Sequence, residues 1–121
     1  MEKLVATEEK ANLMDYRAMR NFEWSTVEQD FSWFETGKLN IAYEAIDKHA
    51  NSARASKIAL YYNDTTRNDS YTFFDMMIQS NKAANVIKEY GNVEKGDRVF
   101  IFMPRSPELY FALLGALKTG A

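Results

Sequence analysis

The spacing of apolar positions predicts a helix in the first half of the chain. Between residues 39 and 50, apolar side chains recur at steps of four, three and four, the period of one helix face: Leu39, Tyr43, Ile46 and Ala50. Asn40 stands where an N-cap is needed, because its side-chain oxygen can accept a backbone N–H from the first turn. We expect this helix to run to about His49, followed by a polar connection over residues 51–57.

A shorter helix is predicted before it. Ser25 and Glu28 stand three residues apart, as in a capping box where serine and glutamate satisfy each other's backbone N–H groups. This helix should extend to about Trp33, and Gly37 should stop the chain from continuing as a helix. Residues 1–24 carry only a weak helical stripe in polar sequence, so we expect a frayed start.

Two short strands and a turn follow. Residues 58–62 and residues 70–72 are rich in the β-branched and aromatic residues that favour strands. The dense cluster of Asn, Asp and Thr over residues 63–69 is typical of a turn. Together these segments predict a β-hairpin.

A long helix is predicted directly after the hairpin. Thr72 and Asp75 repeat the capping-box spacing. Gly91 fits the position after the last turn, where a left-handed residue ends a helix. Ser80 lies within the apolar face, which is formed by Phe73, Met76, Met77, Ala83, Ala84, Ile87 and Tyr90.

The last part of the chain predicts one strand and one helix. Residues 99–103 are five consecutive apolar residues without alternation, which is typical of a strand buried on both faces of a parallel sheet. Ser106 fits an N-cap and Pro107 fits the first helical position. The helix over residues 109–118 is apolar almost all round, and Gly120 should cap its end.

These elements predict an α/β fold made of N-terminal helices, a hairpin and the first strand–helix unit of a larger domain. A parallel strand needs a parallel neighbour reached through a crossover, and no return strand follows in the 121 residues. We therefore expect the chain to be the truncated front of a longer protein. The uncovered strand edge and apolar helix favour self-association that buries Phe111, Leu114, Leu117 or their neighbours.

Composition narrows the class of partner. The chain is 46% hydrophobic with a net charge of −2, and it has no basic run of the kind that nucleic-acid binders carry. It contains no cysteine, which excludes disulfides and thiolate chemistry. The start of the sequence has no apolar signal segment, and the most apolar stretch, residues 110–117, is far shorter than the ~20 residues of a membrane helix. We expect a cytoplasmic protein without nucleic-acid or membrane partners.

Few residues suggest chemistry of their own. The glycines lack the spacing and the Lys-Ser/Thr pair of a phosphate loop, and a single histidine without cysteine is an uncommon metal set. We interpret His49 as a capping or packing residue at a helix end. Arg105 follows the predicted parallel strand, where ligands gather in open α/β folds, and either meets a phosphate or is a solvated loop residue. Two carboxylate pairs lie in exposed-looking segments: Glu8 with Glu9, and Asp64 with Asp69.

Three stretches resemble a known family. Residues 33–50, WFETGKLNIAYEAIDKHA, resemble the N-terminal signature of the acetyl-CoA synthetase family, with an aromatic pair, a Gly-x-Leu-Asn step and an Asp-basic-His ending. Residues 58–91 share the strand–Tyr-Thr-Phe–helix pattern of adenylate-forming enzymes. Residues 95–121, KGDRVFIFMPRSPELYFALLGALKTGA, are similar to the Gly-Asp-Arg-Val, Pro-x-x-Pro-Glu and Lys-x-Gly-Ala block of that superfamily. The first stretch narrows the resemblance to the acetate-type branch.

The resemblance implies the N-terminal fragment of an AMP-forming acetate–CoA ligase, which joins acetate to ATP as acetyl-AMP and then transfers the acetyl group to CoA. Residues 1–50 would be a helical N-terminal extension, and residues 51–121 the incomplete start of the AMP-binding domain. ATP, Mg²⁺ and CoA are implied for the parent enzyme and no cofactor for the fragment, whose partner would be the remainder of its own chain.

The family's phosphate loop, its nucleotide-binding segments and its catalytic lysine have no match here. We therefore assign no catalytic, cofactor-binding or metal-binding residue to this chain, and Arg105 falls at a variable position of the family pattern. The fragment alone should be inactive. Two alternatives stay open: another short-chain acyl-CoA ligase, of the propionate type, because the acyl pocket lies downstream, and a non-catalytic helical interaction module.

Overall fold

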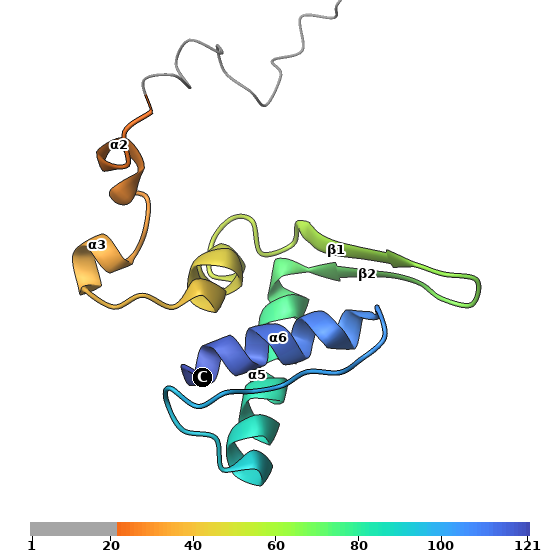
Figure 1. Ribbon diagram of the computed structural model, residues 1–121. Helices are drawn as coiled ribbons and strands as arrows, with labels where there is room; N and C mark the ends of the chain where they lie inside the picture. Colours follow the sequence, from red (N-terminus) through yellow and green to blue (C-terminus); the bar gives the residue numbers. More distant parts are fainter. Residues whose placement is uncertain (1–21) are drawn as a thin grey trace, which may run out of the picture. The chain divides into compact units, whose positions relative to one another are not determined.

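The computed structural model describes residues 22–121, which belong to two compact units divided between Gly37 and Lys38 (Figure 1). The weak helical stripe expected in residues 1–24 falls almost entirely outside the described residues, as do Glu8 and Glu9.

The first unit contains two single helical turns where one short helix was expected. α2 (Ser25–Glu28) and α3 (Trp33–Thr36) are separate elements, so the expectation of one helix reaching Trp33 is wrong. Gly37 ends α3 as expected, in the left-handed conformation with a φ of 66°. A residue with a Cβ is strained there, which is why glycine is favoured at this position.

The capping box expected at Ser25 is also wrong. Trp24 occupies the N-cap position with helical dihedral angles, so Ser25 already lies inside the helix. A capping serine needs extended backbone, which Ser25 does not have. The hydroxyl of Ser25 faces the Glu23 carboxylate at 3.4 Å instead, and the hydroxyl of Thr26 donates to the Glu23 carbonyl at 2.7 Å.

The second unit begins with the helix predicted from the 39–50 pattern. It is α-helical at residues 41–42, widens into the π-helix η1 (Tyr43–Asp47) and closes as α4 (Lys48–Ala50). The backbone N–H of Tyr43 donates to the Asn40 side-chain oxygen at 3.2 Å, which confirms the predicted cap. The π-helical segment was not foreseen from the sequence.

The predicted hairpin is confirmed. β1 (Ile58–Asn63) pairs antiparallel with β2 (Asn68–Thr72), with an irregularity between Ile58 and Leu60. The turn is held by Asp64, whose carboxylate accepts the backbone N–H groups of Thr66 at 2.6 Å and Arg67 at 2.7 Å. This Asx-type arrangement is the local bonding for which aspartate is favoured in turns.

α5 (Phe73–Gly91) starts at the predicted capping box. The Asp75 N–H donates to the Thr72 hydroxyl oxygen at 3.1 Å, and the Thr72 N–H donates to the Asp75 carboxylate at 2.9 Å. These hydrogen bonds lower the pKa of Asp75, chiefly through the Thr72 side chain. The buried residues of the helix are Met76 and Ser80, both on the predicted inner face.

Two details of α5 correct the sequence prediction. Gly91 is the last helical residue, and Asn92 adopts the left-handed conformation after it, with a φ of 48°. Asparagine tolerates this conformation better than most residues, so it takes the role assigned to Gly91. Tyr90, expected on the apolar face, is 81% exposed, because the last turn of α5 extends past the helices that cover the rest.

Removing the cap should weaken the chain in a pH-dependent way. We expect Thr72→Ala to lower the free energy of unfolding by about 1 kcal/mol at neutral pH. The pKa of Asp75 is lower in the folded chain than in the unfolded chain. The stability that ionised Asp75 contributes is therefore present above its unfolded-state pKa and is lost as the pH falls through its folded-state pKa. Denaturant titrations at pH 7 and pH 3 check this, with Asp75→Asn as the control that should show less of the acid-dependent loss.

α6 (Pro107–Thr119) also follows the prediction at both ends. Pro107 is its first residue and Gly120 ends it with a φ of 86°. Ser106 occupies the N-cap position, but its side chain makes no capping hydrogen bond. Hydrogen bonding with Ser106 instead helps to lower the pKa of Glu108, which lies in the first turn.

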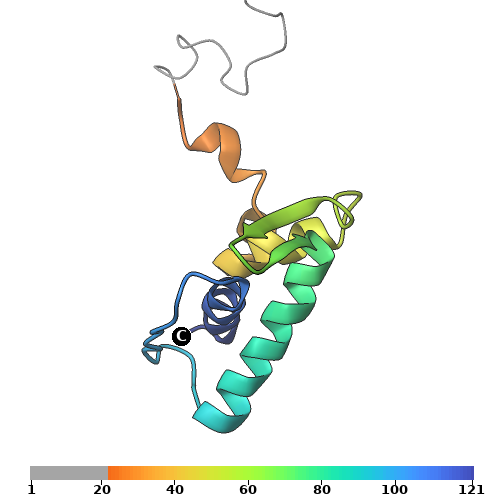
Figure 2. The same cartoon turned by 90° about the vertical axis from the view of Figure 1, so that its right-hand side faces the viewer.

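The core of the second unit lies where α6 crosses α5 (Figures 1 and 2). Gly115 faces α5 so closely that a Cβ built on it would lie 2.7 Å from the Ala83 Cβ and 2.8 Å from the Ala84 backbone nitrogen. The helices therefore meet backbone to backbone at this point. The 41–50 helix adds the buried apolar residues Ala42, Ile46 and Ala50.

The strand predicted over residues 99–103 is not present. The only sheet among residues 22–121 has two strands, β1 and β2, and residues 97–104 have no regular structure. Exposure alternates only over residues 99–102: Val99 and Ile101 are half-buried, whereas Phe100 is 91% and Phe102 is 93% exposed, and Met103 is exposed again at 43%. Five apolar residues do not make a strand on their own, because a ladder needs a second strand to accept its hydrogen bonds.

The described chain thus combines helices with a small two-stranded sheet, which confirms the mixed helix-and-strand class. None of the helices in residues 22–121 is both long and apolar enough to cross a membrane.

Candidate functional site

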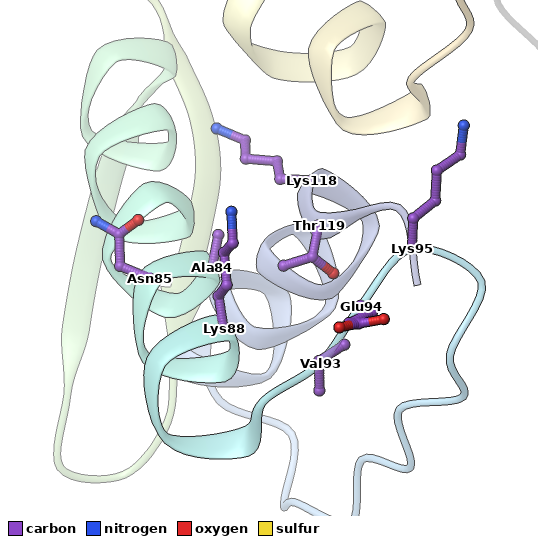
Figure 3. Close-up of a pocket in the computed structure, with 8 residues that line it drawn as sticks. All are labelled: Ala84, Asn85, Lys88, Val93, Glu94, Lys95, Lys118 and Thr119. Atoms are coloured by element: carbon purple, nitrogen blue, oxygen red, sulfur yellow. The ribbon is translucent and has the colours of Figure 1, made fainter.

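A groove of about 450 Å³ lies where the last turns of α5 and α6 meet the loop after α5 (Figure 3). Three of the residues that line it are lysines and one is a glutamate. The lining is formed by Ala84, Asn85, Lys88, Val93, Glu94, Lys95, Lys118 and Thr119. The charges of these side chains decide what the groove can hold.

The groove lies at the negative ends of two helix dipoles. Lys88 stands in the last turn of α5 and Lys118 in the last turn of α6. Cations at these positions stabilise the free carbonyl groups of a helix end. A phosphate is favoured at helix N-termini, where N–H groups point at it, and no such end faces this groove. Lys88 and Lys118 are therefore explained by the stabilisation of the two helix C-termini.

Lys118 is the most constrained of these side chains. It leaves α6 towards α5 (Figure 3), and its Nζ lies 2.6 Å from the Asp47 Oδ1 and 2.7 Å from the Asn81 Oδ1. The side chains of Lys118 and Asp47 are 10% and 18% exposed. Close by, the Asn40 amide donates to the Leu117 carbonyl at 3.1 Å. We call Asn40, Asp47, Asn81 and Lys118 the helix junction, because they tie η1, α5 and α6 together.

The candidate residues from the sequence lie apart from this groove. His49 is on α4, where its ring packs against Phe73 with centroids 5.1 Å apart, and its Nδ1 lies 3.5 Å from a guanidinium nitrogen of Arg54. This contact agrees with a packing histidine. Arg105 is exposed in the loop before α6.

The aspartates of the hairpin have local roles. Asp64 accepts the Tyr62 hydroxyl at 2.6 Å, and this bond, with the backbone N–H groups of the turn, holds the pKa of Asp64 far below its usual range. Asp69 pairs with Arg67 at 2.8 Å, and Arg67 also reaches Glu108 at 3.3 Å. Asp64 is thus ionised at neutral pH and serves the turn, so it is unsuited to donate a proton.

The residues that sequence analysis missed are those of the helix junction. Asp47 and Lys118 are 71 positions apart, and Asn81 and Lys118 are 37 apart. The one signal in the sequence was the placement of Lys118 at the tip of an otherwise apolar helix. Within residues 22–121 no three His, Asp or Glu side chains are grouped as a metal ion would require.

Comparison with known proteins identifies the family. The model of the AMP-binding enzyme family matches residues 46–121, which is more than half of the chain. Acetyl-coenzyme A synthetase of Bacillus subtilis is 60% identical over 122 residues, covering the whole chain and 21% of that protein. A 3-hydroxypropionyl-coenzyme A synthetase of Sulfurisphaera tokodaii is 42% identical over 90 residues, covering 74% of the chain and 14% of that protein. Acetyl-coenzyme A synthetase of Campylobacter jejuni is 35% identical over 91 residues, covering 75% of the chain and 14% of that protein.

The chain belongs to the AMP-binding enzyme family. It spans about a fifth of the length of the Bacillus subtilis relative and less of the others. The resemblance to adenylate-forming enzymes stated from the three sequence stretches is confirmed.

The lysine-lined groove does not fit ATP or Mg²⁺. The lysine-lined groove faces helix C-termini, and its most buried ammonium group is already paired with Asp47 and Asn81. Mg²⁺ is bound through carboxylates and phosphate oxygens, and the described part of the chain groups no such set of carboxylates.

Proposed function

We propose that these 121 residues form the N-terminal part of an acetate–CoA ligase. The observation that carries the proposal is the 60% identity with the Bacillus subtilis protein along the whole chain. In the proposed reaction an acetate oxygen attacks the α-phosphorus of ATP, giving acetyl-AMP and pyrophosphate. The CoA thiol then attacks the acetyl carbonyl, its proton is lost, and AMP leaves with the bonding electrons.

The proposed contribution of this chain is structural. Residues 1–50 would be the helical N-terminal extension and residues 51–121 the start of the AMP-binding domain. ATP, Mg²⁺ and CoA would be bound by the remainder of the ligase. In support, the lysine-lined groove does not fit the nucleotide, and the described residues contain no cluster of three His, Asp or Glu side chains for a metal ion. Neither His49 nor Arg105 is given a catalytic role.

The remainder of the ligase is the proposed partner. Residues 97–104 carry apolar side chains that are nearly fully exposed and a backbone that belongs to no sheet. A strand from the remainder would supply the missing ladder and cover Phe100 and Phe102. A cytoplasmic location is part of the same proposal, since the reaction consumes ATP and CoA.

The two identities favour acetate over larger acids as the substrate. The 3-hydroxypropionyl-coenzyme A synthetase is 42% identical over 74% of the chain, whereas the Bacillus subtilis acetyl-coenzyme A synthetase is 60% identical over the whole chain. A free-standing interaction module is less favoured, because the family model covers residues 46–121.

Acetate-dependent exchange of pyrophosphate into ATP tests the proposal. We expect exchange from the protein encoded by the complete reading frame that contains these residues, with acetate more effective than propionate. We expect none from the isolated 121-residue chain. A complete protein that folds and binds nucleotide but shows no exchange with acetate or propionate contradicts the proposed function.

A further inference from the structure

We draw no further inference here: the strongest candidate, the apolar edge formed by Phe100 and Phe102 in the irregular segment of residues 97–104, carries none, because nothing in the structure shows what covers it.

Discussion

Replacing Gly115 by alanine should destabilise the second unit by about 2–3 kcal/mol, although alanine normally favours a helix over glycine by about 1 kcal/mol. The added Cβ would stand 2.7 Å from the Ala83 Cβ and 2.8 Å from the Ala84 backbone nitrogen. Real Cβ atoms do not approach so closely, and the backbone of α5 cannot move aside as a flexible side chain would. The two helices must therefore separate at this crossing.

Gly91→Ala is the matched control for this substitution. Gly91 also lies in a helix, but its added Cβ would meet only the Val93 Cγ2, at 3.2 Å. We expect the free energy of unfolding of Gly91→Ala to stay within about 0.5 kcal/mol of the value for the unsubstituted chain. Denaturant unfolding followed by circular dichroism measures both variants. Equal stabilities for the two would mean that α5 and α6 do not meet at Gly115.

Lys118→Met should lower the free energy of unfolding by about 2 kcal/mol. The substitution keeps the apolar stem but leaves Asp47, which is only 18% exposed, without the ammonium group 2.6 Å away, and it also removes a donor from Asn81. Breaking a buried ion pair by removing one partner typically costs 3–5 kcal/mol, and partial exposure reduces that figure here.

Lys88→Met is the control, since Lys88 lines the same groove but is exposed. It should change the stability by no more than about 0.5 kcal/mol. Asp47→Asn combined with Lys118→Met completes a double-mutant cycle, in which we expect a coupling of about 1 kcal/mol or more. Additive effects of the two substitutions would show that Lys118 and Asp47 do not stabilise the fold as a pair.

Local signals predicted the helix ends and the hairpin well. The capping pair Thr72 and Asp75, the Asn40 cap and the left-handed Gly37 all act within four residues, so their spacing in the sequence carries the information. The same reasoning failed at Ser25, because a capping box is recognised by residue types and not by the backbone conformation that a neighbour adopts.

Contacts between distant residues could not be predicted in this way. The Lys118 contacts with Asp47 and Asn81 join three helices and leave no spacing pattern. For residues 99–103 the sequence predicted a strand that is not formed. Their composition is that of a buried strand, but a strand forms only when a second strand accepts its backbone hydrogen bonds, and the described residues contain no such partner. The candidate site could not be predicted from the sequence either. The sequence suggested His49 and Arg105, and neither residue lines the groove.

A chimera tests the central claim most directly. In it, this chain replaces the segment of Bacillus subtilis acetyl-coenzyme A synthetase to which it aligns, and acetate-dependent ATP–pyrophosphate exchange is measured beside the unsubstituted relative. We expect exchange within about tenfold of the relative, unchanged by His49→Ala or Arg105→Ala in the chimera. A folded chimera without exchange would contradict the assignment of this chain to an acetate–CoA ligase, and loss of exchange on either substitution would contradict its purely structural role.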